Sequence, residues 1–435
     1  MKYLMKALKS RTLKILVLLL ICVIVLRVNY EESDCPGVWF GADRGPYLQN
    51  MSSTTMVIKW RYRGNDIARV RYGVSPDELS EKVEKDSDSS DHEILLKNLI
   101  PDTRYYYQVN DSTETVFSFR TPPVEGEAKP TRVWVLGDSG TADSNAIDVK
   151  NAFEKFNGGS ATDLVLMLGD NAYDDGADCE YQKAFFDIYP LTIAETPVMP
   201  TIGNHDARTD GAAPYRKIFT LPRDGKTGVV PSGTESYYSF NYSNIHFVSL
   251  DSETSNRSPG GAMHSWLMAD LAANTQDWTI VYFHHPPYSK GNHDSDKAGA
   301  LSDMREHYTA IFEQYGVDLV FAGHSHGYER SFPIKGHRGT SDTFLQSMKT
   351  DTGDGRKDGD GEYSKPYHSV DQGVIYTVAG SSGKTRPAPY NHPVHYLSMS
   401  KLGSVVLDFN GDEVNVTFVS PDPEAIDHFT LVKTN

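Results

Sequence analysis

Short apolar runs separated by turn residues fill residues 45–122 of the chain. Runs such as "STTMVIKWRY", "TRYYYQVN" and "TVFSFRT" are rich in β-branched and aromatic residues. Strand-like runs of this length at this spacing predict two packed antiparallel sheets. We therefore expect an all-β sandwich at 45–122, and the polar, proline-rich stretch Pro122–Pro130 predicts a stiff linker after it.

Longer apolar strands alternate with helical stretches from Thr131 onward. "RVWVLGD" predicts a strand, and "SNAIDVKNAFEKFNGG" predicts a helix with Ser144 as N-cap and Gly158 just beyond its end. Further strands follow, and Asn410-Gly411 marks a closing hairpin. Because such apolar strands are buried on both faces of their sheets, residues 131–421 predict a layered α/β sandwich. A chain of 435 residues also exceeds one ordinary core, which agrees with two domains.

Residues 1–30 carry a third pattern, that of an export signal. Five basic residues and no acidic residue precede an unbroken apolar run, Ile15–Leu26, which Arg27 closes. This run is short for a membrane span of about 20 residues but suits the core of a signal peptide. No small-residue cleavage site follows, so a cleaved signal and an uncleaved anchor through residues 13–28 both stay open. Either predicts an exported protein that is secreted, periplasmic or attached to the cell surface.

Net charge and cysteine content limit which partners and which cellular compartments the protein can have. The net charge of −16 and the lack of a Lys/Arg-rich block argue against nucleic acid as a partner. An anionic substrate would then be attracted by local cations such as bound metals. Cys35 and Cys179 could pair in an oxidising compartment, or could stay unpaired thiols. A eukaryotic secretory pathway could glycosylate five sequons, at Asn50, Asn110, Asn241, Asn256 and Asn415.

Five predicted strands end in residue types that bind metals. The segments "GDSG", "GDNAY", "GNHD", "FHHPPY" and "GHSH" each look like an ordinary turn or cap when taken alone. Because the carboxyl ends of strands in an α/β sheet meet at one crevice, their side chains should converge. These are Asp138, Asp170, Tyr173, Asn204, His205, His284, His285, His324 and His326.

The donor types indicate a centre of two metals. The candidate ligands are carboxylates, an amide, imidazoles and a phenol, and none is a thiolate, which excludes a cysteine-rich structural zinc site. There are also more of these donors than one tetrahedral metal can bind. Paired metals that share a carboxylate suit displacement at phosphorus. The series GDxG, GDxxY, GNH, a strand-end His before Pro, and GHxH resembles the purple acid phosphatases, within the calcineurin-like metallophosphoesterases.

This resemblance spans Thr131 to about Phe418, and Tyr173 points to the purple acid branch. The sandwich at 45–122 resembles the fibronectin type III-like domain of many such enzymes; a small sandwich of another family is the alternative. The resemblance implies one metal held by Asp138, Asp170, Tyr173 and His326, and a second held by Asp170, Asn204, His284 and His324.

The choice between His284 and His285 stays open at this stage. The family's ligand stands two residues before a proline, as His284 does, whereas His285 directly precedes Pro286. A phenol with a pKa near 10 binds as phenolate only to a strongly polarising cation. The resemblance thus implies Fe³⁺ beside Tyr173 and Zn²⁺, Mn²⁺ or Fe²⁺ at the other site.

The implied activity is that of an acid phosphatase, in which metal-bound hydroxide attacks small phosphate monoesters. His205 and His293 are placed to bind phosphate or to protonate the leaving oxygen. His293 stands nine residues after His284, as in the family, but Asp294 follows where the family often has a second histidine. That departure leaves the source of the leaving-group proton and the substrate preference open.

Two other functions fit the same sequence. A phosphodiesterase or nucleotide pyrophosphatase would use the same strand-end residues, with selectivity set by the pocket rim, which includes the insertion 335–372. Within it, Asp351–Tyr363 predicts a solvated loop; calcium binding is the alternative. A non-catalytic cell-surface binding protein is a function of another class. The pattern predicts no oligomeric state.

Overall fold

The computed structural model describes residues 43–435 except 63–66, 111–114, 226, 298 and 424–426. The predicted export signal therefore lies outside the described residues. Cys179 is disulfide-bonded, and the other two cysteines, Cys22 and Cys35, also lie outside the described part. Among the residues described, no helix is long and apolar enough to cross a bilayer.

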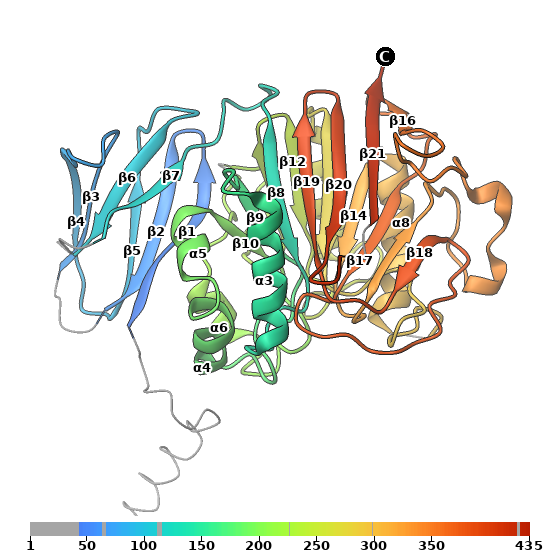
Figure 1. Cartoon of the computed structure of the whole chain (residues 1–435), viewed down its shortest axis with the longest axis horizontal. Helices are drawn as coiled ribbons and strands as arrows, with labels where there is room; N and C mark the ends of the chain where they lie inside the picture. The colour runs from blue at the N-terminus through green and yellow to red at the C-terminus, as the bar shows by residue number, and fades with distance from the viewer. Residues whose placement is uncertain (1–42, 63–66, 111–114, 226, 298, 424–426) are drawn as a thin grey trace, which may run out of the picture. The chain divides into compact units, whose positions relative to one another are not determined.

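A β-sandwich opens the described chain, as the sequence predicts (Figure 1, blue and cyan strands). One sheet has the strand order β1-β2-β5 and the other β4-β3-β6-β7, and all their pairings are antiparallel. In β5, buried His92, Ile94 and Leu96 alternate with less buried neighbours, so one face of the strand meets the core. The strands are β1 (Arg44–Ser52), β2 (Thr55–Arg61), β3 (Ile67–Gly73), β4 (Glu81–Asp86), β5 (Asp91–Leu96), β6 (Arg104–Val109) and β7 (Phe117–Arg120).

Two seven-stranded sheets form the rest of the described chain. The first has the order β10-β9-β8-β19-β20-β21-β16, with β8, β9 and β10 parallel to one another. Its strands are β8 (Thr131–Leu136), β9 (Leu164–Met167), β10 (Val198–Pro200), β16 (Tyr363–Pro366), β19 (Ser404–Asn410), β20 (Glu413–Val419) and β21 (Asp427–Thr434).

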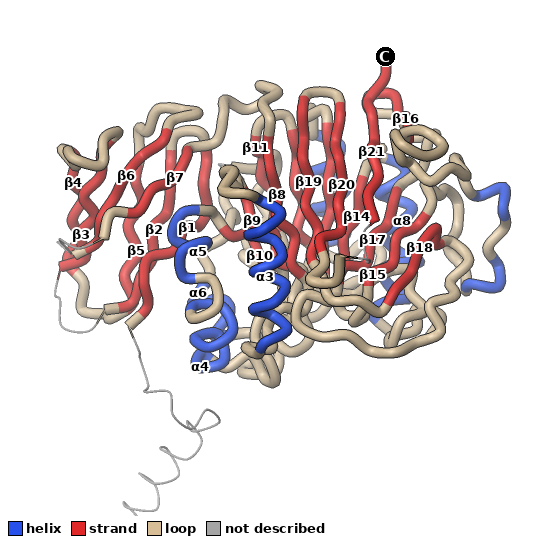
Figure 2. Tube along the Cα trace, viewed as in Figure 1, coloured by secondary structure: helices blue, strands red, loops and turns tan. Residues whose placement is uncertain are grey.

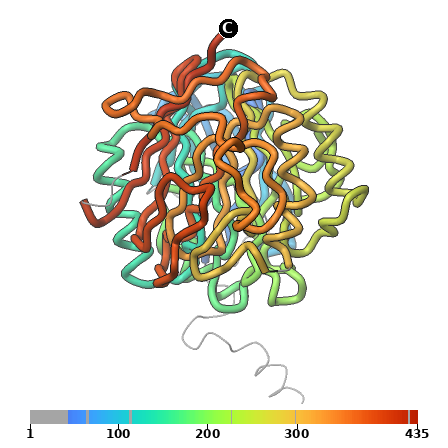
Figure 3. The backbone as a smooth tube through the Cα atoms, turned by 90° about the vertical axis from the view of Figure 1, so that its right-hand side faces the viewer, coloured from blue at the N-terminus to red at the C-terminus, as the bar shows by residue number. Residues whose placement is uncertain are grey.

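The second sheet has the order β11-β12-β13-β14-β17-β15-β18, and β12, β13, β14 and β17 are parallel. Figure 3 views the domain from the side where the later segments, orange and red, lie nearest. The strands are β11 (Tyr238–Tyr242), β12 (Ile245–Ser249), β13 (Trp278–Phe283), β14 (Leu319–Ala322), β15 (Tyr328–Ser331), β17 (Ile375–Ala379) and β18 (His395–Met399).

Helices cover the outer faces of the two sheets (Figure 2). Phe153 of α3 stacks on Trp134 of β8, with ring centroids 3.9 Å apart. Alternate residues of β13 enter two different cores: Ile280 faces the first sheet, whereas Val281 packs with α7 and α8. The helices are α3 (Ser144–Asn157), α4 (Asp178–Tyr181), α5 (Pro190–Glu195), α6 (Ala213–Ile218), α7 (Ala262–Ala273) and α8 (Ala300–Gln314), with the π-turn η1 (Gln182–Phe186) and the 3-10 turns η2 (Ser341–Thr343) and η3 (Gln346–Met348).

This arrangement confirms the predicted layered α/β sandwich and corrects one detail. The N-cap of α3 is Asp143, not Ser144, because the Asp143 carboxylate accepts the backbone N–H groups of Asn145 and Ala146. Gly158 ends the helix with φ 58°, as predicted. The Asn410-Gly411 turn joins β19 to β20, also as predicted.

Candidate active site

Polar side chains follow five parallel strands at their carboxyl ends. In the first sheet, β8 ends before Asp138, β9 before Asp170, and β10 before Asn204. In the second sheet, β13 leads directly into His284, and β14 ends just before His324. Because parallel strands end at the same edge, these loops meet, as the sequence predicts. Hydrogen bonds, ion pairs and ring contacts link all the predicted site residues.

Three residues at these strand ends have positive φ angles, which residues other than glycine rarely adopt. Asp138, Asp170 and His324 have φ values of 56°, 52° and 66°. Left-handed conformations of non-glycine residues cost free energy and concentrate at functional sites, where the surrounding fold holds them in place. Gly203 lies so close to Asp170 that a side chain there would collide with its backbone nitrogen. The loops are therefore shaped to aim specific side chains into one crevice.

The first group of donors surrounds the Tyr173 hydroxyl. This hydroxyl donates to Asp138 Oδ1 at 3.0 Å and to Asp170 Oδ2 at 2.9 Å. His326 Nε2 lies 3.4 Å from the same hydroxyl and 3.4 Å from Asp138 Oδ1. Four side chains from three strand ends thus place two carboxylates, one phenol and one imidazole around a single point.

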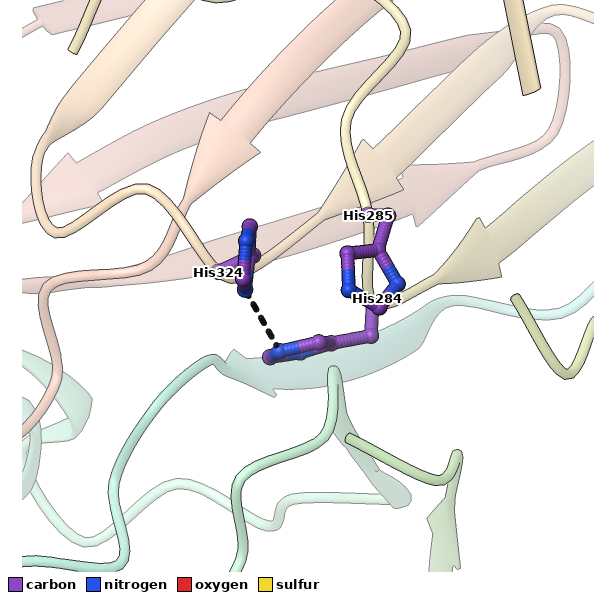
Figure 4. Close-up of side chains that lie close together, drawn as sticks. All are labelled: His284, His285 and His324. Atoms are coloured by element: carbon purple, nitrogen blue, oxygen red, sulfur yellow. Dashed lines mark hydrogen bonds between the residues drawn. The ribbon is translucent and has the colours of Figure 1, made fainter. Parts of the chain in front are cut away.

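The second group surrounds the side chain of Asn204. Asn204 Oδ1 lies 3.0 Å from His284 Nε2 and 2.9 Å from His324 Nδ1, and these two nitrogens are 3.1 Å apart (Figure 4, dashed line). Asp170 Oδ1 lies 3.4 Å from His284 Nε2. Oxygen and nitrogen atoms that converge this closely suit a divalent cation of the first transition series. Two clusters that include side chains from these groups have ligand atoms close enough together to hold a metal ion. They are Asp138–Asp170–His284 and His284–His285–His324.

Electrostatics also favour a cation here. Asp138 is fully buried, and although burial opposes its ionisation, His326 and His284 hold its pKa below the ordinary value. Burial and the neighbouring histidines lower the pKa of His324 well below 6.5, so its ring is neutral and retains a lone pair. Burial, with Asp138 and Asp170, raises the pKa of Tyr173 well above 10. Phenolate formation here would therefore need a strong cation to replace the proton.

The structure distinguishes the two adjacent histidines that the sequence leaves open. The Nδ1 atom of His284 lies 2.9 Å from the carbonyl oxygen of Leu168, so its Nε2 faces Asp170 and Asn204. His285 turns elsewhere: its Nδ1 lies 2.9 Å from Ser252 Oγ, and its Nε2 lies 3.6 Å from Glu253. Figure 4 shows the two rings pointing in different directions. His284 therefore joins both groups of donors, whereas His285 stands behind them.

His205 and His293 flank these groups. The backbone N–H of His205 donates to Asp170 Oδ1 at 2.8 Å, and its ring stands edge-on to Tyr173 with centroids 4.4 Å apart. The ring of His293 lies against His324 with centroids 3.8 Å apart, and burial lowers the His293 pKa to about 4. Asp294, in contrast, pairs with Lys290 at 2.8 Å, so its carboxylate is engaged by a lysine.

Known families match both parts of the chain. The model described as "Calcineurin-like phosphoesterase" matches residues 131–328, and the one described as "Purple acid Phosphatase, N-terminal domain" matches residues 46–121. Over these two ranges the chain is similar to the purple acid phosphatases. This confirms the resemblance predicted from the strand-end motifs and from the sandwich.

Individual relatives agree with this family. Purple acid phosphatase 23 of Arabidopsis thaliana is 26% identical over 67% of this chain and 65% of its own length. The Arabidopsis protein named "Probable inactive purple acid phosphatase 24" is 25% identical over 78% of this chain and 54% of its own. The chain thus spans less than two thirds of either relative. The yellow lupin purple acid phosphatase PPD1 shares the fold with a TM-score of 0.71 at 18% identity, covering 90% of this chain and 75% of that one.

Two residues of this site were not predicted from the sequence. Asp206 accepts hydrogen bonds from Gly203 N–H at 2.8 Å and from the Tyr181 hydroxyl, and burial raises its pKa to about 7. It holds the Asn204 loop and stands inside the "GNHD" segment, where it could have been found. Lys384 follows β17 and lies over the Tyr173 ring, with Nζ 3.3 Å from the ring centroid. The run "VIYTVAG" before it has the same strand-then-glycine pattern as the other site segments.

Proposed function

We propose that this chain is an acid phosphatase with two metals, which hydrolyses small phosphate monoesters. The observation that carries the proposal is the position of Asp170. Its Oδ2 accepts the Tyr173 hydroxyl at 2.9 Å, while its Oδ1 lies 3.4 Å from His284 Nε2. One carboxylate thus faces both groups of donors, which is what a bridging ligand requires.

The proposed ligand sets follow from the two groups. Asp138, Asp170, Tyr173 and His326 would hold Fe³⁺, since a phenolate ligand needs a strongly polarising cation. Asp170, Asn204, His284 and His324 would hold Zn²⁺, Mn²⁺ or Fe²⁺. The contact of His284 with Leu168 O supports its assignment over His285, because it leaves Nε2 free to face the site. When bound, the metal pair supplies an activated water and neutralises the negative charge of the phosphate.

The chain's own histidines would handle the substrate. His293 is neutral at mildly acidic pH, because burial lowers its pKa to about 4, so it would donate an N–H to a phosphate oxygen. His205 Nδ1 lies against the carbonyl oxygen of Asp174 and therefore carries a hydrogen, so Nε2 offers a transferable proton only in the imidazolium form of the ring. We assign the protonation of the leaving oxygen to His205, since Asp294 is engaged by Lys290.

Export is part of the same proposal. The disulfide at Cys179 supports an oxidising compartment, in agreement with the basic and apolar pattern of residues 1–30. Whether those residues are cleaved or serve as an anchor can be read from the N-terminal sequence of the mature protein.

The test compares the wild-type protein with Asp170→Asn. Wild type should contain two metal ions per chain, including iron, and should hydrolyse p-nitrophenyl phosphate at mildly acidic pH. Loss of the bridging charge should lower kcat at least 100-fold and reduce the metal content. Asp148→Asn is the matched control, since Asp148 is exposed on α3 and belongs to neither group of donors.

Two results would contradict the proposal. An Asp170→Asn protein with unchanged activity would exclude the two-metal site. A metal-loaded wild type that hydrolyses neither monoesters nor diesters at any pH would favour the non-catalytic binding protein instead. Faster hydrolysis of bis(p-nitrophenyl) phosphate than of the monoester would favour the diesterase.

A further inference from the structure

Lys384 lies on a loop that is fixed against the proposed metal site. The loop follows β17, and the Ser382 N–H donates to the carbonyl oxygen of Gly137 at 3.0 Å. The Gly137 N–H donates back to Ser382 Oγ at 3.2 Å, and Thr141 Oγ1 donates to Gly383 O at 3.3 Å. These bonds join the Lys384 loop to the loop that carries Asp138.

Two glycines let this loop approach so closely. A side chain at Gly380 would collide with the carbonyl oxygen of Ser325, which stands between His324 and His326. A side chain at Gly383 would come within 2.6 Å of the Asp138 carbonyl oxygen. The backbone that leads into Lys384 is therefore packed against the site loops, and the lysine is held beside the donor groups.

The Lys384 ammonium has an aromatic contact but no counter-ion among the described residues. Its Nζ lies 3.3 Å from the centroid of the Tyr173 ring, a distance at which the ring face attracts a cation. The side chain is half-buried. Burial lowers its pKa, but the carboxylates of Asp138, Asp170 and Asp174 oppose that effect. Asp138 and Asp170 are proposed metal ligands, so bound metals would neutralise their negative charge. Lys384 would then be attracted less to these carboxylates.

Two other cations near the site already have partners. Lys290 lies 2.8 Å from Asp294 and 2.7 Å from Asp296. Arg208 donates to Asp174 O at 3.0 Å and lies 3.4 Å from Asp175. Lys384 thus differs from both in that its positive charge is available to an anion that enters the crevice.

Resting on the proposed function, we propose that Lys384 Nζ binds a phosphate oxygen of the substrate and selects monoester dianions over diesters. A phosphate monoester carries between one and two negative charges at mildly acidic pH, because its second pKa is about 6. A diester carries one charge, and its second ester group replaces an oxygen that the ammonium would bind. The charge-assisted hydrogen bond therefore favours the monoester.

The experiment uses the full-length protein with Lys384→Met, which keeps the stem of the side chain and removes its charge. For p-nitrophenyl phosphate, kcat/KM should fall about 10- to 100-fold, the loss expected for one hydrogen bond to a charged group. For bis(p-nitrophenyl) phosphate it should change less than about threefold. Equilibrium dialysis with inorganic phosphate should give a Kd raised by about the same factor as the monoester loss.

Two further variants separate binding from a structural effect. Lys384→Arg should restore part of the monoester activity, because it restores the charge. Lys129→Met removes a lysine that pairs with Glu127 on the surface, outside the pocket rim, and it should leave both substrates unaffected. The metal content of all variants should equal that of wild type.

Equal losses for monoester and diester, or an unchanged Kd for inorganic phosphate in Lys384→Met, would overturn the role of Lys384. The phosphate measurement needs no turnover, so it tests Lys384 even in a protein that hydrolyses nothing. A wild type without metals and without hydrolysis would overturn the proposed function instead, and the two failures are therefore distinguishable.

Discussion

Tyr173 is the residue whose chemistry depends most on its neighbours. Its hydroxyl donates to two carboxylates, Asp138 at 3.0 Å and Asp170 at 2.9 Å, which keep the phenol protonated when no cation competes for it. A cation between these oxygens would reverse the preference, since it binds the phenolate and removes the proton. The protonation state of Tyr173 therefore depends on whether a metal occupies the first group of donors.

Replacing Tyr173 with phenylalanine should abolish the visible absorption expected of a phenolate–Fe³⁺ pair. Iron content, measured by elemental analysis, should be retained because Asp138, Asp170 and His326 remain. Tyr367→Phe is the control, since that hydroxyl bonds to Asp412 on the surface, and its visible spectrum should match wild type. A Tyr173→Phe protein that keeps the absorption band would contradict the assignment of this ligand.

At the scale of elements, the strand ends were predictable because their signal is local. Each site segment follows an apolar run that can only be a buried strand, and a polar residue there must lie at the sheet edge. The prediction placed the N-cap of α3 one residue too late, because the side chains of both Asp143 and Ser144 can accept hydrogen bonds from the free N–H groups at a helix start. Local sequence alone does not rank them.

Lys384 shows why the rest of the site could not be predicted. Lysine is common on surfaces, and the strand-then-glycine run before Lys384 does not indicate which side chain its ammonium contacts. Its place depends on β17 pairing between β14 and β15, strands more than 40 residues earlier in the chain. The strand β21 was also absent from the sequence prediction, although it pairs with β20 and β16 in the first sheet.

A buried lysine pair links the first sheet to the segment that leads into β14 of the second sheet. Lys365 of β16 donates to the carbonyl oxygens of Gly316, Val317 and Gly373, at 3.1, 2.7 and 3.0 Å. Both Lys365 and Lys433 lie beside the single carboxylate of Asp318, at 3.3 and 2.7 Å. Burial lowers the Lys365 pKa from its ordinary 10.5 to about 8.

Stability should therefore rise with pH between about 8 and 10.5, where the unfolded chain binds the lysine proton and the folded chain does not. The gain is at most about 3 kcal/mol. Lys365→Met removes this titration, so urea midpoints at about pH 7.5 and 10 should differ less than in wild type. Lys335→Met should keep the wild-type rise, and an undiminished rise in Lys365→Met would contradict the role of Lys365.

At the scale of the whole molecule, the sandwich and the α/β domain are parts of one compact unit, Gly41–Asn435. Asp178 of α4 is central to their contact: its carboxylate lies 2.8 Å from Arg44 and 2.7 Å from Arg61, both on sandwich strands. The two arginine side chains are only 2% and 5% exposed. Arg61 also reaches Asp91 at 2.5 Å, but no other carboxylate among the described residues contacts Arg44.

Asp178→Asn should lower the free energy of unfolding by about 3 kcal/mol, because it leaves a buried guanidinium without a counter-ion. The measurement is the urea midpoint at neutral pH. Asp371→Asn breaks an exposed pair with Lys335 and should change stability by less than about 0.5 kcal/mol. Because Asp178 lies outside both groups of donors, folded Asp178→Asn should keep the kcat of wild type. Equal stability of the two variants would mean that the sandwich is held by other contacts, such as the Tyr107 hydroxyl on Ala194 O at 2.7 Å.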